Sequence, residues 1–288
     1  MEILNPRPAL ALPQTMWLCY STVARNNGVA EEQLLRLLVP EEMLETVPQK
    51  GAHAPRAISD LIELGLIDVD SEGMLSAEPT DVAGFLRKLR RVVVVPPVDI
   101  SPSFDGTPDL RAGLVWLMRQ SPFSPLYWDT GVQTEMPTGL FTNDTRWNGF
   151  RFWSGALGFA RPALKILVSG SSGSANHITA DPTDAILDVL LSPGDASHFP
   201  SGEAIPVGTF MNSLRNELPI LPGHPSAVYD GMDTDASSEW AAVGLALNCA
   251  EARGVLKMGY QSDPTGVAAL PSNEGSGPRY VSWVEVLK

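Results

Sequence analysis

The stretch that decides the predicted fold is residues 55–77, which read PRAISDLIELGLIDVDSEGMLSA. Its first half carries apolar residues at helical spacing and begins with proline, which is favourable as the first residue of a helix. The predicted helix ends at Gly65. Two short apolar segments then flank the turn Asp70–Gly73, where glycine suits the positive φ of a tight turn. The stretch therefore predicts a helix followed by a two-stranded hairpin.

Two further helices are predicted before this stretch. Residues 13–25 place Trp17, Tyr20 and Val23 at helical spacing, and residues 31–38 begin with two glutamates, which complement the dipole at a helix N-terminus. Three short helices followed by a hairpin is the order of a winged-helix domain. In such a domain the third helix reads the DNA major groove and the hairpin forms the wing. The sequence therefore predicts a winged-helix domain at this end.

The rest of the chain predicts mostly helices separated by Pro- and Gly-rich loops, including a loop over 98–107. In the last part, helices again precede a hairpin, and residues 280–287 alternate as a final strand. The predicted fold class is mainly α with some β, with winged-helix-like units at both ends joined by a helical middle. The predicted domains are a winged-helix domain with its following helix (1–95), an aromatic-rich helical middle (96–180) and a winged-helix-like domain (181–288).

The first candidate DNA-binding residues lie at or just before the start of the predicted recognition helix: Lys50, His53 and Arg56. A helix that enters the major groove presents its N-terminal residues to the base edges, so these side chains stand where readout would occur. The alternative is that they are ordinary surface residues of a winged helix that contacts proteins. Asp60 and Glu63 on the same helix favour this alternative, because carboxylates repel phosphates.

A second basic group lies on the helix that follows the hairpin: Arg87, Lys88, Arg90 and Arg91. Spacings of three and four place the three arginines on one side of that helix, where they would neutralise several phosphates. The alternative is equally physical, because cations at a helix C-terminus are favoured by the helix dipole.

Charge and composition exclude several classes of protein. The formal net charge is −13, of which residues 1–92 carry −4, residues 93–180 none and residues 181–288 −9, so the last third repels a phosphate backbone. No apolar run approaches the roughly 20 residues of a membrane-spanning helix, and the N-terminal residues lack the pattern of an export signal. Cys19 and Cys249 have apolar neighbours, which favours neither a disulfide nor a metal site. The sequence predicts a cytoplasmic protein without a membrane segment.

No catalytic site, metal site or small-molecule cofactor is predicted. The four histidines have no metal-ligand spacing, and residues 170–174 lack the residues of a phosphate-binding loop, so they are expected to be a flexible connector. His177 lies near Ser174, Asn176 and Asp181 in the sequence, but local groups of this kind arise by chance. The carboxylates are plentiful in an acidic chain and are expected on the surface.

Residues 141–159 read FTNDTRWNGFRFWSGALGF and are unusually aromatic. A base-stacking surface is one interpretation, but the helical spacing of Trp147, Phe150 and Trp153 favours burial in a core, with Phe152 directed elsewhere. The segment resembles the signature of the DpdG-type proteins. The residues that carry this resemblance are Asn143, Asp144, Arg146, Trp147 and Trp153.

Three other pieces are similar to the same family and occur in the same order: residues 3–6 with Pro13 before Trp17, residues 181–183, and residues 218–221 followed by Gly223. The chain departs from the family pattern at residues 222–225 and in a longer loop at 170–178. DpdG-type proteins occur in bacterial gene clusters that insert 7-deazaguanine bases into DNA and restrict unmodified DNA. The resemblance implies an accessory component of such a system and supplies no catalytic residues.

The function that these observations favour is a non-enzymatic adaptor or DNA-sensing subunit of a multi-protein anti-phage system. Its expected partners are other subunits of a defence complex, with double-stranded DNA as a further candidate. Two alternatives remain open. One is a stand-alone DNA-binding transcriptional regulator, which would form a two-fold dimer on a palindromic site. The other is a hydrolase whose site involves His177 or His198.

Overall fold

The computed structural model describes the following residues: 1–5, 9–26, 28–46, 51–100, 104–136, 139–164, 176–192, 199–229, 232, 240–262, 264, 266–271 and 277–287. The chain divides into two compact units, each built from two separate segments. Unit 1 comprises Met1–Arg111 and Gly139–Leu157, and unit 2 comprises Ala112–Thr138 and Gly158–Lys288. Each unit is described by itself.

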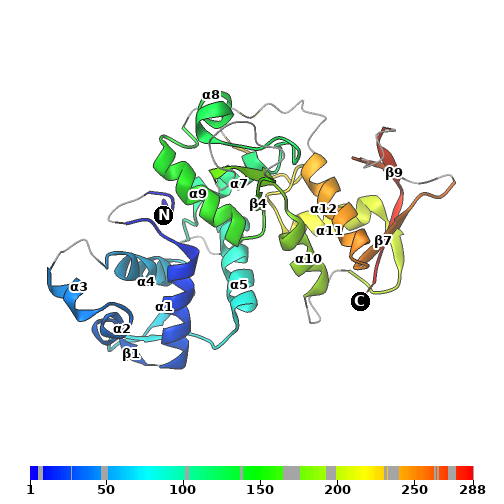
Figure 1. The fold of residues 1–288 in the computed structure, drawn as a ribbon. Helices are drawn as coiled ribbons and strands as arrows, with labels where there is room; N and C mark the ends of the chain where they lie inside the picture. Colours follow the sequence, from blue (N-terminus) through cyan, green and yellow to red (C-terminus); the bar gives the residue numbers. More distant parts are fainter. Residues whose placement is uncertain are drawn as a thin grey trace. The chain divides into compact units, whose positions relative to one another are not determined.

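Unit 1 holds the first helices and a small sheet (Figure 1). Its elements are α1 (Pro13–Arg25), β1 (Val29–Ala30), α2 (Glu31–Leu38), α3 (Glu41–Thr46), α4 (His53–Glu63), β2 (Asp68–Val69), β3 (Met74–Ser76), α5 (Val82–Val94), α6 (Pro97–Ile100) and α9 (Asp144–Ala156). Helix α7 (Pro108–Leu117) begins in unit 1 and ends in unit 2.

The sheet of unit 1 has the strand order β1-β3-β2 and is antiparallel. The predicted hairpin is confirmed: β2 pairs with β3, and Gly73 takes a φ of 80° in the turn between them. The Asp70 carboxylate closes this turn, because it accepts hydrogen bonds from the backbone N–H groups of Glu72 (2.8 Å) and Met74 (2.9 Å). Aspartate is common in turns for this reason.

The core of unit 1 forms where α1 packs on α4. Helix α1 buries Met16, Cys19, Tyr20 and Val23, and α4 buries an apolar face that includes Ile58. The Tyr20 hydroxyl, at the edge of this core, donates to the Glu78 carbonyl at 2.6 Å. Apolar residues three and four apart line one face of a helix, which is why the sequence pattern located these helices.

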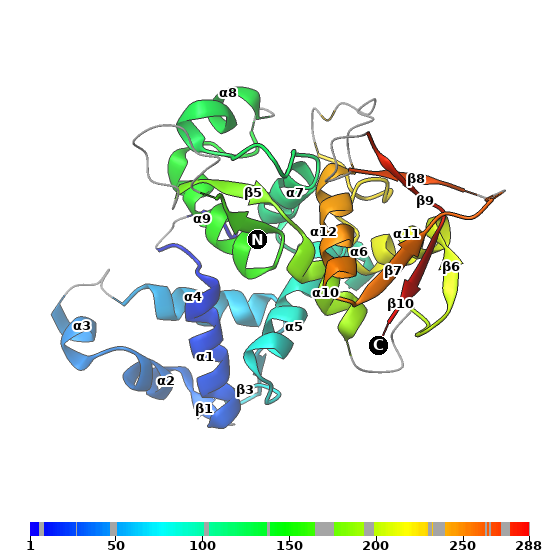
Figure 2. The same cartoon turned by 45° about the vertical axis from the view of Figure 1, so that its right-hand side comes forward.

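Unit 2 holds the remaining part of α7 and a second group of helices and strands (Figure 2). Its further elements are the irregular helical turn η1 (Trp128–Val132), α8 (Gln133–Glu135), β4 (Ala160–Pro162), β5 (Ile178–Ala180), α10 (Thr183–Leu191), β6 (Ala204–Pro206), α11 (Val207–Glu217), α12 (Ala241–Ala252), β7 (Leu256–Gly259), β8 (Ala268–Leu270), β9 (Arg279–Val281) and β10 (Trp283–Val286).

The main sheet of unit 2 has the antiparallel order β6-β10-β7 (Figure 2). Strands β8 and β9 form a separate antiparallel pair between β7 and β10 in the sequence. Along the chain, α10, β6, α11, α12, β7 and β10 repeat the order helix, strand, helix, helix, strand, strand. Unit 1 follows this order with α3 added, and in both units the third of these strands lies between the other two.

The mixed α and β class is confirmed, and two local predictions are wrong. The predicted loop at 98–107 begins with the short helix α6, whose first turn is favoured by Pro97. The single final strand is instead two strands, because β9 pairs with β8 whereas β10 pairs with β6 and β7. The connector at 170–174 lies outside the described residues. Among the described helices, none combines the length and apolarity needed to cross a bilayer.

Candidate functional site

The first candidate site is the surface formed by α4 and the β2–β3 hairpin, which we call the α4–hairpin surface (residues 53–76). The apolar face of α4 is buried, whereas the side chains of Ser59 and Glu63 on the same helix are exposed. On the hairpin Asp68, Asp70 and Glu72 are exposed. The α4–hairpin surface contains one arginine against five carboxylates. Its charge is therefore negative, opposite to what a phosphate backbone requires.

Arg56, the arginine of this surface, points into unit 1. Its Nε lies 2.8 Å from the Asp60 carboxylate, and its Nη2 donates to the Glu2 carbonyl at 3.3 Å. The side chains of Arg56 and Asp60 are 15% and 4% exposed. Burial raises the pKa of Asp60, and Arg56 lowers it in part by hydrogen bonding and by its charge. Arg56 is therefore held by a buried carboxylate. The prediction that α4 faces DNA did not anticipate this contact.

The other two candidates on this surface are placed differently. His53 is exposed at the first position of α4, and its Nδ1 lies 2.9 Å from the Leu10 carbonyl. Lys50 lies outside the described residues. The structure thus brings His53 and Arg56 to the start of one helix, with both side chains turned toward the N-terminal segment.

The basic residues of α5 do not form one exposed row. Arg90 is buried and its Nε donates to the Leu157 carbonyl at 2.8 Å, whereas Arg91 is exposed. Arg87 is half-buried. Lys88 forms an ion pair with Glu78, and this hydrogen bond raises the pKa of Lys88 and lowers that of Glu78. Arg90 therefore cannot meet phosphates together with Arg87 and Arg91, because its side chain faces the interior of unit 1.

The aromatic segment of the signature is part of the core. Asn143 caps α9 by accepting a hydrogen bond from the Arg146 N–H at 2.9 Å, next to Asp144 in the first turn. Trp147 and Phe150 stack against each other and around Phe141. Asn143 thus caps the start of α9, and the aromatic residues bury one face of this helix, as their spacing predicted. Phe152 is exposed.

Two signature residues also tie α9 to the N-terminal segment. The Arg146 guanidinium pairs with the Glu2 carboxylate at 2.6 Å, and the Trp153 indole N–H donates to the Ala11 carbonyl at 2.9 Å. Both partners belong to unit 1. These two signature residues of the central segment therefore help to assemble unit 1.

The suspected hydrolytic group is not assembled in the described part of the chain. His177 is buried and stacks on Tyr127, with ring centroids 4.4 Å apart, and its Nδ1 has no hydrogen-bond partner there. The Asp181 carboxylate accepts from the Thr183 N–H at 3.0 Å and lies 3.2 Å from Arg161. Ser174 and His198 lie outside the described residues, and no described group of His, Cys, Asp and Glu is arranged to hold a metal ion.

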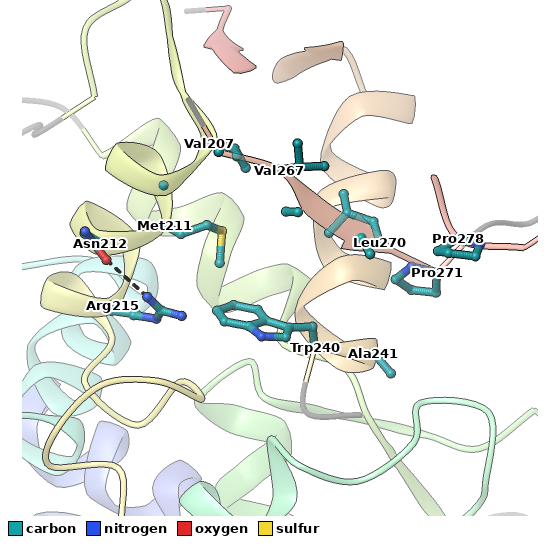
Figure 3. Close-up of a pocket in the computed structure, with 14 residues that line it drawn as sticks. Val207, Met211, Asn212, Arg215, Trp240, Ala241, Val267, Leu270, Pro271 and Pro278 are labelled. Carbon is teal, nitrogen blue, oxygen red and sulfur yellow. Dashed lines mark hydrogen bonds between the residues drawn. The ribbon is translucent and has the colours of Figure 1, made fainter. Parts of the chain in front are cut away.

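Unit 2 contains a cavity of about 690 Å³ that the sequence did not predict (Figure 3). Its described lining comes from α11, the start of α12, strand β8 with the residues beside it, and Pro278 before β9, and Arg215 is the one charged residue in this lining. No local sequence pattern points to the cavity, because its walls come from segments that are far apart along the chain.

A comparison with protein families gave a match to one family model, described as DpdG-like, over residues 1–264. Comparisons with curated proteins and with solved structures gave no match. The family match covers the central aromatic segment and the shorter pieces that pointed to this family. The chain therefore belongs to the DpdG-like family.

Proposed function

We propose that the chain is a non-enzymatic adaptor of a multi-protein system that modifies and restricts DNA, and that it docks a basic protein surface through the α4–hairpin surface. Family membership supports a role in the Dpd modification system. A cytoplasmic location and partners from the same defence complex are part of this proposal.

The proposal treats both units as winged helices. Apart from α3 in unit 1 and the β8–β9 pair in unit 2, each follows the order helix, strand, helix, helix, strand, strand, with the last of these strands central in the sheet. This agrees with the winged-helix arrangement, in which the third helix of the order and the hairpin form the contact surface. In unit 1 this contact surface corresponds to α4 with β2 and β3. In unit 2 it corresponds to α12 with β7 and β10, and the β8–β9 pair extends the wing.

The observation that carries the choice of a protein partner is the charge of the α4–hairpin surface. Four of its carboxylates are exposed, and its one arginine is held by the fifth, Asp60. A DNA reader places cations at this position, because each phosphate contact releases counterions from the duplex. Exposed carboxylates favour a basic protein instead, and complementary charge increases the rate and specificity of such an encounter.

A second exposed surface, which lies in unit 2, supports the adaptor proposal, because an adaptor needs more than one contact surface. Tyr260, Val267 and Tyr280 are each about half exposed and line a shallow hollow beside the β8–β9 pair. Tyrosine is enriched at protein interfaces because its ring buries apolar area while its hydroxyl stays polar.

Fluorescence anisotropy with a random duplex of about 30 base pairs at about 50 mM salt tests the choice between DNA and protein. We expect no binding by the natural chain. The variant Ser59→Lys/Asp68→Lys/Glu72→Lys should acquire salt-dependent binding, because it places cations where a winged helix meets phosphates. Salt-dependent binding by the natural chain would contradict the adaptor proposal, and Arg91→Glu would then show whether α5 carries it.

A pull-down with the other subunits of the system tests the docking itself. Binding of a basic subunit should weaken as salt rises, and Asp68→Lys/Glu72→Lys should reduce it strongly. The matched control is Asp129→Lys/Glu203→Lys, which makes the same charge change at exposed positions of unit 2. Equal loss with both variants would mean that net charge alone is responsible and would reject the α4–hairpin surface.

A further inference from the structure

The cavity of unit 2 has the size and lining of a site for a small molecule (Figure 3). Its volume of about 690 Å³ lies within the usual range of ligand pockets, roughly 300–1,000 Å³. Most of its lining is apolar, with the indole of Trp240 at one end. Its larger apolar lining residues include Val207, Met211, Val267, Leu270, Pro271 and Pro278.

The walls of the cavity are fixed by contacts in unit 2. Strand β8 is held on α12, because Asn248 donates from its side chain to the Pro271 carbonyl at 2.8 Å. Pro271 also packs directly on Gly244, where no side chain would fit. The opposite wall is the first half of α11. A cavity whose walls are held in this way is preformed. Binding of a ligand therefore loses less free energy to the ordering of side chains and loops.

Arg215 is held in place at the end of the cavity next to Trp240. Its Nε donates to the Pro222 carbonyl at 3.0 Å, its Nη1 donates to Asn212 at 3.1 Å, and its guanidinium lies 4.6 Å from the centre of the Trp240 ring. Gly223 leaves room for this guanidinium, because a Cβ there would collide with it. Residues 218–223, one of the pieces similar to the family, thus shape the position of Arg215.

The charge of Arg215 is not matched within the described residues. None of their carboxylates forms an ion pair with it, and none of them lines the cavity. Its Nη2 makes no hydrogen bond there and keeps its donors available. Burial lowers the pKa of Arg215, and no acid among the described residues offsets this effect. An anion bound at this end would receive charge-assisted hydrogen bonds.

We propose that this cavity binds a small organic anion with an apolar, ring-containing body, whose acidic group meets Arg215 and whose rings lie among Trp240, Met211 and Leu270. This ligand site is independent of the proposed docking by unit 1. The surrounding third of the chain carries a net charge of −9, so one cation in an apolar pocket gives the site its selectivity for an anion.

Two fluorescent probes of the same ring system test this proposal: 8-anilinonaphthalene-1-sulfonate, and N-phenyl-1-naphthylamine, which lacks the sulfonate. Both should bind the full chain at one site. Arg215→Met keeps the apolar stem and removes the charge, so it should weaken binding of the sulfonate about tenfold and that of the neutral probe less than twofold. Arg253→Met, an exposed arginine of unit 2 outside the cavity, is the matched control and should change neither affinity.

A second variant blocks the cavity itself. Gly208 lines it, and a Cβ at this position has no neighbour within 4 Å, so Gly208→Leu should fill space without disturbing α11 and should abolish binding of both probes. Urea unfolding of each variant establishes that it is folded. Unchanged binding in Gly208→Leu, or equal weakening of both probes in Arg215→Met, would reject the proposed site.

Discussion

At the scale of single residues, the ion pair between Arg56 and Asp60 decides how α4 is interpreted. Asp60 is buried, and the pair lies one helical turn apart with an N···O distance of 2.8 Å. A buried carboxylate that loses its partner retains its desolvation penalty. Removing one member of such a pair therefore lowers the free energy of unfolding far more than replacing both members by apolar residues. Arg56 is therefore a residue on which the stability of unit 1 depends.

We expect Arg56→Ala to lower the free energy of unfolding by about 3 kcal/mol, measured by urea denaturation. The double variant Arg56→Met/Asp60→Leu should recover most of this loss, because apolar side chains need no partner there. Arg36→Ala is the control: it breaks an exposed pair with Glu32 at the same spacing and should cost less than about 0.5 kcal/mol. A loss in Arg56→Ala as small as in this control would show that the first pair is not buried.

Cys19 gives a second test at this scale. Its thiol is buried against α4, and burial raises its pKa to about 12, so it stays protonated at neutral pH. Since the thiolate is the reactive form, Cys19 should not react with a thiol reagent at pH 8 while the chain is folded. Titration with such a reagent should modify the half-buried Cys249 first and Cys19 only in denaturant. Equal rates for the two thiols in the folded chain would contradict the burial of α1 on α4.

At the scale of elements, the pairing of β7 with β10 depends on one glycine. Gly259 lies opposite Trp283 in this sheet, and the indole lies across the position that a Cβ would occupy. An aromatic ring that covers a glycine on a neighbouring strand restores the packing that the missing side chain would give. The pair therefore fixes the register of the central strand of this sheet.

Gly259→Val should displace the indole and destabilise the chain by about 2 kcal/mol, although valine is a better strand residue than glycine. The contribution of Trp283 to the near-ultraviolet circular dichroism should change as well. Lys257→Val, an exposed change on the same strand, removes only the contact of the ammonium with the Trp283 ring at 5.9 Å and should stay within about 1 kcal/mol of the natural chain. A stabilised Gly259→Val variant with an unchanged spectrum would mean that the ring does not cover Gly259.

Elements were more predictable from the sequence than sites. The helix and hairpin at 55–77 follow from spacing and turn residues, which are local properties. The sequence also shows that Arg56 and Asp60 are four residues apart, but their burial depends on packing between α1 and α4. The cavity was not predictable, because Arg215, Trp240 and Leu270 meet only after the helices and strands of unit 2 have packed.

At the scale of the whole molecule, the two units interrupt each other along the chain. Ala112–Thr138 belongs to unit 2 but precedes a segment of unit 1. This segment supplies unit 2 with a buried group of side chains and with the backbone pairing of Leu126 with Ile178. The buried group consists of Leu114, Val115, Trp116, Leu117 and Met118.

The fragment 158–288 alone should therefore lack a cooperative urea transition, because part of the core of unit 2 is missing. The fragment 112–288 restores the missing segment and should unfold cooperatively. Tryptophan fluorescence and circular dichroism report on both fragments. A cooperative transition in the shorter fragment would show that residues 112–138 are not part of the unit.

The interrupted path of the chain also sets an order of events at the ribosome. Unit 1 is complete once α9 has emerged, whereas residues 112–138 must wait for the strand at Ile178 and the helices after it. Synthesis at roughly 5–20 residues per second gives a delay on the order of ten seconds before the last strand appears. During this time the apolar side chains from Leu114 to Met118 are exposed on the nascent chain, and a chaperone that binds apolar segments has its clearest target there.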